Sequence, residues 1–348
     1  MRLKHPQKTL IPVCLILLLV SAVFFLKSPG SSVDNSQVQR IEFHSRHMGS
    51  LFRVIIYSSD KDSARIAADS AFAMANYLNS VFSDYDPDSE LSLLSDHAGS
   101  GKYVRVSEHM FRLLETAQEI STQSNGAYDI TIGPLSRLWR DVIRGKRTTL
   151  PNTEELKAAR RATGFKHLLL DTESMSVSLT LPGMKLDPGG IAKGYTADRM
   201  SEVLASMGFV HTLVDAGGDM VLGSAPPGSA GWEIAILIHD HNARQGHLLL
   251  HLENTALTTS GDLFQYYEHG GLRYSHIINP VTGVGLTQRT SVTVLGAEGA
   301  IVDAWATALN VLAGDHGLKN LSCNPGYHAR IEVLDTTGIS IHKTGFFE

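Results

Sequence analysis

The feature that most constrains this 348-residue sequence is a largely apolar, uncharged run near its N-terminus, from Leu10 to Leu26. Basic residues, among them Arg2 and Lys8, precede the run. Its length is at the lower edge of what spans a bilayer, and no clean small-x-small cleavage site follows it. We expect an uncleaved membrane anchor over residues 1–28, with a cleaved signal peptide as the alternative. In both cases the basic flank stays in the cytoplasm and the rest of the chain is exported.

The remaining sequence divides into a short polar segment and one large domain. Residues 29–41 are polar and small, which is typical of a linker, and residues 42–348 are long enough to bury their own core. A net charge of −5 without a basic run gives no support to nucleic-acid binding. The two cysteines, Cys14 and Cys323, exclude a disulfide framework within the domain and a cysteine-ligated zinc or iron–sulfur site.

Apolar spacing and turn residues predict a mixture of helices and strands with no internal repeat. We expect helices over residues 64–81, 107–121, about 151–163, 192–207 and 300–313. We expect strands over residues 51–57, 168–171, 176–179, 210–214, 232–238, 247–252, 273–278 and 290–295. Neighbouring strands in the second half are predicted to be antiparallel, so the fold class is α+β or mixed α/β with one compact catalytic unit.

The stretch LDPGGIAKGY, residues 186–195, is the first candidate for chemistry. Gly189 and Gly190 allow a close approach of the backbone, and the helix start that follows offers free N–H groups to a phosphate. Lys193 lies one turn inside that helix. The pattern is neither a dinucleotide fingerprint nor a Walker loop, and a plain strand–turn–helix corner explains it equally well.

Asp303 and Thr307 form a second candidate, because residues four apart share one helix face. A carboxylate and a hydroxyl together suit a hard cation such as Mg²⁺. The alternative is a solvated helix face, but the neighbouring residues are apolar and would solvate the charge of Asp303 poorly.

His276, in HGGLRYSHIINPVTG, is either a buried core imidazole or a group that faces a substrate. The polar stretches SDYDPDSEL, DAGGD and TTSGD are either ligand-binding segments or ordinary turns. His239, His241, His247 and His251 match no metal motif and are interpreted as surface residues.

Eight blocks in order make the sequence similar to the ApbE family of FAD:protein FMN transferases, over about residues 42–348. They are MGSLFRV, SDYDPDSEL, GAYDITIGPLSRLW, LDPGGIAKGYTAD, DAGGD, ALTTSGD, RYSHIINPVTG and SVTVLGAEGAIVDAWATALNVL. The resemblance implies an α+β fold of two lobes with FAD in the cleft between them. It also implies a Mg²⁺-dependent reaction that attaches FMN to a threonine or serine of another protein and releases AMP.

The resemblance assigns roles to individual positions of this chain. FAD contacts are expected at Met48, Tyr85, Ala127, Tyr128, Asp129, Asp187, Lys193, His276 and Ile277. The metal is expected at Asp303, Thr307 and the backbone carbonyl of Gly190, where only the backbone is needed and glycine is harmless. Catalysis is expected to involve Asp303 and His276, the latter as base or as positioning group. Asn279 and Pro188 depart from many relatives, and because neither is an expected ligand, these departures bear on turn geometry more than on activity.

The expected partners are FAD, an exported or membrane-bound acceptor protein with a reactive Thr or Ser, and the inner membrane through the N-terminal segment. The catalytic domain is then periplasmic. Two other functions stay open from the residues: an FAD pyrophosphatase that gives FMN and AMP, and an exported flavin-binding protein without turnover.

Overall fold

The computed structural model describes residues 38–239, 244–261, 265–335 and 338–348. The chain divides into two units, Met1–Val38 and Gln39–Glu348, and all of the described helices and strands belong to the second. The predicted anchor over residues 1–28 lies outside the described residues. In the part of the chain that the structure describes, none of the helices combines the length and the apolar character that crossing a membrane requires.

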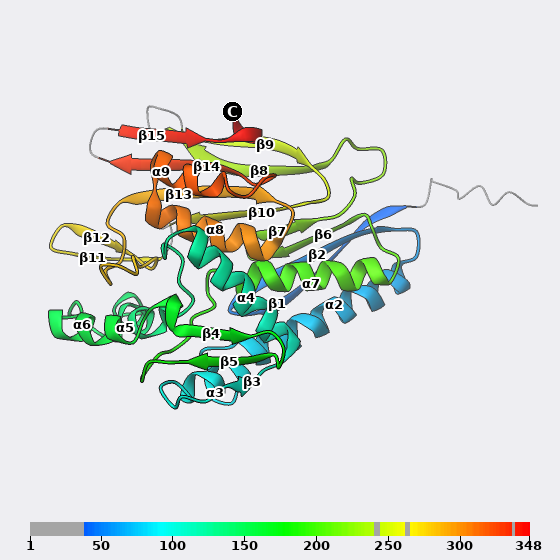
Figure 1. Ribbon diagram of the computed structural model, residues 1–348. Helices are drawn as coiled ribbons and strands as arrows, with labels where there is room; N and C mark the ends of the chain where they lie inside the picture. The colour runs from blue at the N-terminus through cyan, green and yellow to red at the C-terminus, as the bar shows by residue number, and fades with distance from the viewer. Residues whose placement is uncertain (1–37, 240–243, 262–264, 336–337) are drawn as a thin grey trace, which may run out of the picture. The chain divides into compact units, whose positions relative to one another are not determined.

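The second unit is built on an eight-stranded sheet with the order β1-β2-β6-β7-β10-β13-β14-β15 (Figure 1). Its strands are β1 (Gln39–His47), β2 (Ser50–Ser58), β6 (Thr212–Ala216), β7 (Asp219–Leu222), β10 (Thr255–Gly261), β13 (Arg289–Gly296), β14 (His328–Asp335) and β15 (Gly338–Lys343). Every neighbouring pair in it is antiparallel. The predicted antiparallel arrangement is therefore confirmed.

Three small antiparallel sheets accompany the large one. They are β3 (Val104–Arg105) with β5 (Ser176–Leu179) and β4 (Leu168–Asp171), β8 (Trp232–His239) with β9 (Gln245–Leu252), and β11 (Tyr266–His269) with β12 (Leu272–Ser275). The predicted hairpin over residues 168–179 is β4–β5. The strand predicted over residues 273–278 ends earlier, at Ser275, so His276 follows the strand instead of lying within it.

The helices are α2 (Lys61–Phe82), α3 (Glu90–Asp96), α4 (Glu108–Gln123), α5 (Gly133–Ile143), α6 (Thr153–Arg161), α7 (Ala192–Ser206), α8 (Gly299–Leu312) and α9 (Gly314–Leu321), with short 3₁₀ turns at Phe165–His167 and Gly345–Phe347. Local sequence explains several starts: Ser107 caps α4 and accepts from the Met110 N–H, and Asn152 caps α6 within a capping box. Mixed α/β structure with antiparallel sheets confirms the predicted fold class.

Helix α8 lies at the centre of the packing. It contacts β10 and β13 of the large sheet on one side and α4 and α7 on the other (Figure 1). Its residues are apolar nearly all round, and Val302, Trp305 and Leu309 have no exposed surface. A charged residue on such a helix, such as Asp303, is consequently held inside the protein.

Helix α2 packs on the sheet through small side chains. Ala64, Ala67, Ala68, Ala71 and Ala75 are completely buried, and their spacing places them on one face. Alanine lets the helix lie close to β1 and α7, which it contacts. The first strand, β1, begins at Gln39, so residues 39–41 of the predicted linker belong to the sheet.

Candidate active site

The start of α7 brings together charged residues from three other elements. The Lys193 ammonium forms an ion pair with Asp219 at the start of β7. The other oxygen of Asp219 accepts a hydrogen bond from the Thr258 hydroxyl at 2.9 Å, because Thr258 and Asp219 are direct partners in the β10–β7 register. Sheet pairing thus fixes Asp219, and Asp219 fixes the position of Lys193.

Asp303 on α8 lies beside this ion pair. Its carboxylate accepts a hydrogen bond of 3.2 Å from the Gly194 N–H at the first turn of α7, and only 4% of the residue is exposed. One turn further along α8, Thr307 packs against Gly190. A Cβ on Gly190 would lie 2.6 Å from the Thr307 hydroxyl oxygen. Position 190 has no room for a side chain next to Thr307, so the close packing itself calls for glycine there.

The charges in this cluster depend on one another. Burial raises the pKa of Asp303 well above its ordinary value and repulsion by Asp219 adds to the rise, while Lys193 and the Gly194 N–H oppose it. Burial alone would lower the pKa of Lys193, but Asp219 and Asp303 raise it above its ordinary value. Burial and Asp219 thus disfavour the charged form of Asp303, and a cation next to its carboxylate would favour that form.

The buried hydroxyl of Tyr128 shows whether the residues around Asp303 fit a metal ion and a phosphate ligand. Tyr128 is 3% exposed, and its hydroxyl has no hydrogen-bond partner among the described residues. Burial raises its pKa well above the ordinary value, and repulsion by Asp303 and Asp187 contributes. Buried polar groups are normally paired, so the free capacity of Tyr128 and Asp303 fits a ligand that supplies both a cation and oxygen atoms.

In the described residues, no group of three or more His, Cys, Asp or Glu side chains could hold a metal ion. The proposed metal site needs only one such side chain, that of Asp303. The other ligands that the family resemblance implies are the Thr307 hydroxyl and a backbone carbonyl at Gly190. Hard oxygen donors of this kind suit Mg²⁺, which usually keeps water and phosphate oxygens as its remaining ligands.

Arg140 on α5 holds together a second group of candidate site residues, separate from the Lys193 cluster. Its guanidinium donates to Asp84 at 2.6 Å and to Asp187 at 3.1 Å, and it lies over the Tyr85 ring, 4.6 Å from the centroid. Arg144 donates to the Tyr85 hydroxyl at 2.7 Å. Tyr85 is 60% exposed, so much of an aromatic side chain held by two arginines is open to solvent.

Three other predicted FAD contacts have well-defined surroundings. Met48 lies in the turn between β1 and β2 at a φ of 48°, and its sulfur accepts from the Thr196 hydroxyl on α7 at 3.6 Å. Ala127 is buried. The oxygens of Asp129 accept hydrogen bonds from the Thr131 N–H and hydroxyl and from the Phe165 N–H. These bonds give Asp129 a role in holding two loops together.

His276 is exposed, which excludes the interpretation as a buried core imidazole. Its backbone N–H donates to the Gln265 carbonyl at 3.1 Å, and its Nδ1 lies 3.2 Å from the same oxygen. The next residue, Ile277, is buried and anchors the segment. The backbone of His276 therefore holds the residue next to the β11–β12 hairpin, while its side chain is open to solvent.

The interpretation of His239 as a surface residue needs correction. Its Nδ1 lies 2.9 Å from the Glu332 carboxylate, which is 4% exposed, and Arg330 bonds the same carboxylate. The three residues join β8 to β14.

Sequence reasoning missed two groups of site residues. Asp219 and Thr258 lie in DAGGD and TTSGD, to which no definite role could be given because they look like loops. Asp84 and Arg140 received no role of their own, since α5 was not predicted. The available signal for α5 was Pro134 at its first turn followed by an amphipathic stretch.

Comparison with known proteins bears directly on this site. The ApbE family model matches residues 48–331. An FAD:protein FMN transferase of Vibrio cholerae is 34% identical over 71% of this chain and 73% of its own length. One from Treponema pallidum is 30% identical over 88% of both chains. The fold and the site define a mixed α/β protein with a buried cluster of Lys193, Asp219 and Asp303. The chain belongs to the ApbE family.

Solved structures agree with this assignment. The flavin transferase ApbE from Vibrio cholerae superposes with a TM-score of 0.80 at 27% identity and covers 89% of this chain and 98% of its own. The flavinyl transferase ApbE of Pseudomonas stutzeri also gives 0.80, at 29% identity, over 90% of this chain and 97% of its own. Both matches extend over nearly the whole second unit.

Proposed function

We propose that this chain is an FAD:protein FMN transferase that moves FMN from FAD to a Thr or Ser hydroxyl of an exported protein, with Mg²⁺ as cofactor. The carrying observation is the buried cluster of Lys193, Asp219 and Asp303 beside the unpaired Tyr128 hydroxyl. A pure flavin-binding protein does not need an acidic pocket of this kind beside a phosphate-binding helix start.

The reaction forms one phosphoester bond and breaks one phosphoanhydride bond. The acceptor hydroxyl oxygen attacks the phosphorus on the FMN side of the pyrophosphate, the bond from that phosphorus to the bridging oxygen breaks, and AMP leaves. The hydroxyl proton passes to a base, for which the exposed His276 imidazole is the candidate. Such transfers depend mainly on placement and on neutralising the phosphate charge.

The residues of the chain divide this work between two regions. Lys193, held by Asp219, neutralises phosphate charge. Asp303 and Thr307 would hold Mg²⁺ with the Gly190 carbonyl, and a bound Mg²⁺ supplies Lewis-acid stabilisation of phosphate oxygens. Tyr85, fixed by Arg140 and Arg144, offers a flat apolar face to a ring of the dinucleotide.

We further propose that the chain is anchored in the inner membrane by residues 1–28, with the catalytic unit in the periplasm. Support comes from the basic flank and the apolar run in the sequence. Protease added to intact spheroplasts should digest the catalytic unit if the proposal holds. Protection until the membrane is opened would contradict it.

The test of the activity uses the full chain in detergent with FAD, Mg²⁺ and proteins extracted from cells of the same species that lack the gene. We expect a polypeptide whose yellow fluorescence survives a denaturing gel, with AMP released in equal amount. An Asp303→Ala variant should give no band. Asp88→Ala, at an exposed position, is its matched control and should give the same band as the wild type. Free FMN and AMP without a band would show a pyrophosphatase, and intact FAD would show a binding protein.

A further inference from the structure

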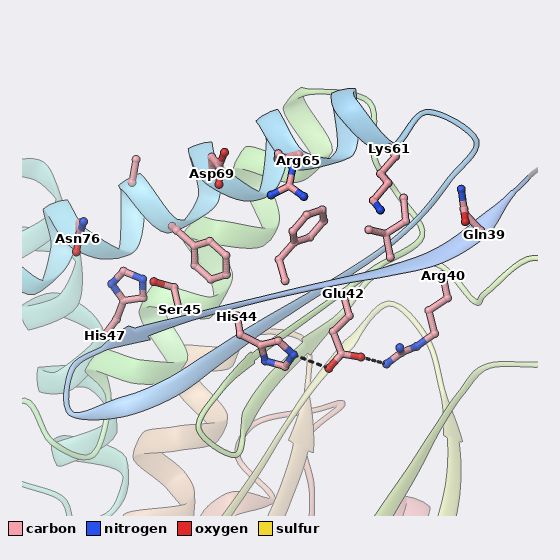
Figure 2. A pocket seen from close by; sticks show the side chains of 14 residues that line it. Gln39, Arg40, Glu42, His44, Ser45, His47, Lys61, Arg65, Asp69 and Asn76 are labelled. Atoms are coloured by element: carbon pink, nitrogen blue, oxygen red, sulfur yellow. Dashed lines mark ion pairs between the residues drawn. The ribbon is translucent and has the colours of Figure 1, made fainter.

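A groove of about 830 Å³ runs between β1 and α2, and none of its lining residues belongs to the Lys193–Asp303 cluster. Figure 2 shows its two sides. Arg65, Asp69, Ala73 and Asn76 follow one another at helical spacing along α2. Residues from both faces of β1 line the groove, which means that it follows the outer edge of the strand.

The inside of the groove is aromatic and incompletely paired. Phe43 lies under the Arg65 guanidinium, 5.6 Å away, and Phe72 stacks on the His47 ring at 5.6 Å. His47 is 7% exposed, and its ring nitrogens make no hydrogen bond of good geometry to the described residues. Burial lowers the pKa of His47, and the nearby Asn76 side chain partly opposes this fall. The groove thus combines apolar surface with a buried imidazole whose nitrogens form no hydrogen bond of good geometry to the described residues.

β1 is an edge strand, since it pairs only with β2 in the described sheet. The two-residue turn Met48-Gly49 makes His47 and Ser50 a hydrogen-bonded pair. By alternation, the backbone groups of residues 40, 42, 44 and 46 point away from β2, toward the groove. A strand edge of this kind is a template for one more strand.

The two faces of β1 differ in a way that suits an added strand. In Figure 2 the side chains of Ser45 and His47 point toward α2, whereas Glu42 and His44 point away. Glu42 is engaged on that far side, 3.0 Å from the His44 ring. An added strand would therefore place every second side chain over Phe43 and Phe72.

The inner end of the groove meets the candidate active site. His47 directly precedes Met48, whose sulfur bonds Thr196 one turn after Lys193 on α7. A segment lying along β1 toward the Met48 turn would thus be delivered to the phosphate-binding end of α7.

We propose that this groove, here named the β1–α2 groove, binds an extended segment of the acceptor protein by strand addition. The proposal rests on the proposed transferase function, because that reaction requires a protein partner to present a hydroxyl at the site. About eight residues would pair with β1, with apolar side chains at alternate positions. Recognition would come from main-chain hydrogen bonds and Phe43 and Phe72, because the charges of the groove are of both signs.

The experiment uses the full chain and the acceptor identified by its fluorescent band. His44→Pro removes an outward N–H without removing a bond to β2, and its control His44→Ala keeps that N–H. Ala73→Trp fills the groove from α2, with Ala73→Ser as its control. We expect the KM for the acceptor to rise about tenfold or more in His44→Pro and Ala73→Trp alone. The rate at saturating acceptor and the affinity for FAD should not change.

Hydrogen exchange gives an independent readout. Amides 40, 42, 44 and 46 should exchange quickly in the free chain and slowly with the acceptor. If the KM for the acceptor stays within twofold of wild type in both blocked variants, the docking proposal is overturned but the proposed function is not. If the wild type transfers no FMN, both the docking proposal and the proposed function are overturned. Slow exchange without the acceptor also overturns the proposal. In a monomer it indicates that the chain covers its own groove, and in a dimer it indicates a second copy.

Discussion

At the residue scale, the charged groups of the site are held by partners that are not themselves expected to touch substrate. Lys193 is the clearest example, since Asp219 fixes its ammonium and Thr258 fixes Asp219. Asp303 stays free for another ligand because Lys193 is already paired. In the proposed mechanism, this arrangement separates Lys193, which would meet the phosphate, from Asp303, which would meet the metal.

Asp219→Asn should disturb this separation. With its partner neutralised, Lys193 would be balanced by Asp303, and the Mg²⁺ concentration needed for half-maximal AMP release should rise about tenfold or more. Asp219→Glu should restore part of the loss. The matched control is Asp215→Asn, which removes a nearby carboxylate that pairs with Arg53. If Asp219→Asn and Asp215→Asn have the same Mg²⁺ dependence, Asp219 does not position Lys193.

His276→Ala should separate folding from catalysis. Because the side chain is exposed, the melting temperature should stay close to that of the wild type, as surface changes usually alter stability by less than about 0.5 kcal/mol. Transfer should fall by about 10²–10⁴-fold, the usual contribution of an acid–base group. FAD affinity, measured by flavin fluorescence, serves as the control. Wild-type transfer rates in this variant would remove His276 from the mechanism.

At the element scale, a side chain from the second turn of α7 caps the start of α8. The Asp198 carboxylate on α7 accepts from the Gly299 and Ala300 N–H groups at the start of α8, at 2.7 and 2.9 Å. Burial raises the pKa of Asp198 to about 6, against the effect of these two hydrogen bonds. The cap of α8 therefore comes from another helix, and it carries an acid that titrates near neutrality.

Asp198 should make stability depend on pH. Below about pH 4 the group is protonated in both folded and unfolded chains, so the cost of burying its charge is absent. Between about pH 4 and 6 the unfolded chain ionises this group while the folded chain keeps its proton, so the free energy of unfolding should fall by about 3 kcal/mol in total and then level off above pH 6. Urea unfolding of the wild type and of Asp198→Asn should show this difference between pH 4 and 7. An equal difference at all pH values would contradict it, and exposed Asp88→Asn is the control.

How much of each element the sequence predicts depends on the range of its contacts. Helices α2, α4 and α6 could be predicted because caps and apolar spacing are local signals. β7 and β10 could not, because Asp219 and Thr258 look like loop residues until the sheet pairs them across 39 positions. Arg140 likewise gains its role only from Asp84, 56 positions away.

At the scale of the whole molecule, the candidate site draws on elements from residue 48 to residue 307. The family resemblance identified Asp303, Thr307 and Lys193 from motifs, and the structure places them around the start of α7. Motifs alone could not show the packing of Gly190 on Thr307, since spatial fit has no local sequence signal. A ligand that joins these elements should stabilise the entire unit.

Ligand binding should therefore raise the melting temperature. FAD at 100 times its dissociation constant should add about 2.7 kcal/mol to the free energy of unfolding, and Mg²⁺ added with FAD should add a further increment. In Asp303→Ala the FAD increment should remain while the Mg²⁺ increment disappears. Calorimetry with and without EDTA measures both. A Mg²⁺ increment that survives in Asp303→Ala would place the metal elsewhere.

The contact between Gly194 and Gly299 limits how such a protein can change during evolution. A Cβ on Gly194 would lie 2.1 Å from the Gly299 carbonyl oxygen, and one on Gly299 would lie 2.6 Å from the Gly194 oxygen. Any larger residue at either position must push the two helices apart and alter the spacing between Lys193 and Asp303. Descendants of this chain can therefore diversify at exposed positions such as Asp88, while the spacing between Lys193 and Asp303 is inherited almost unaltered.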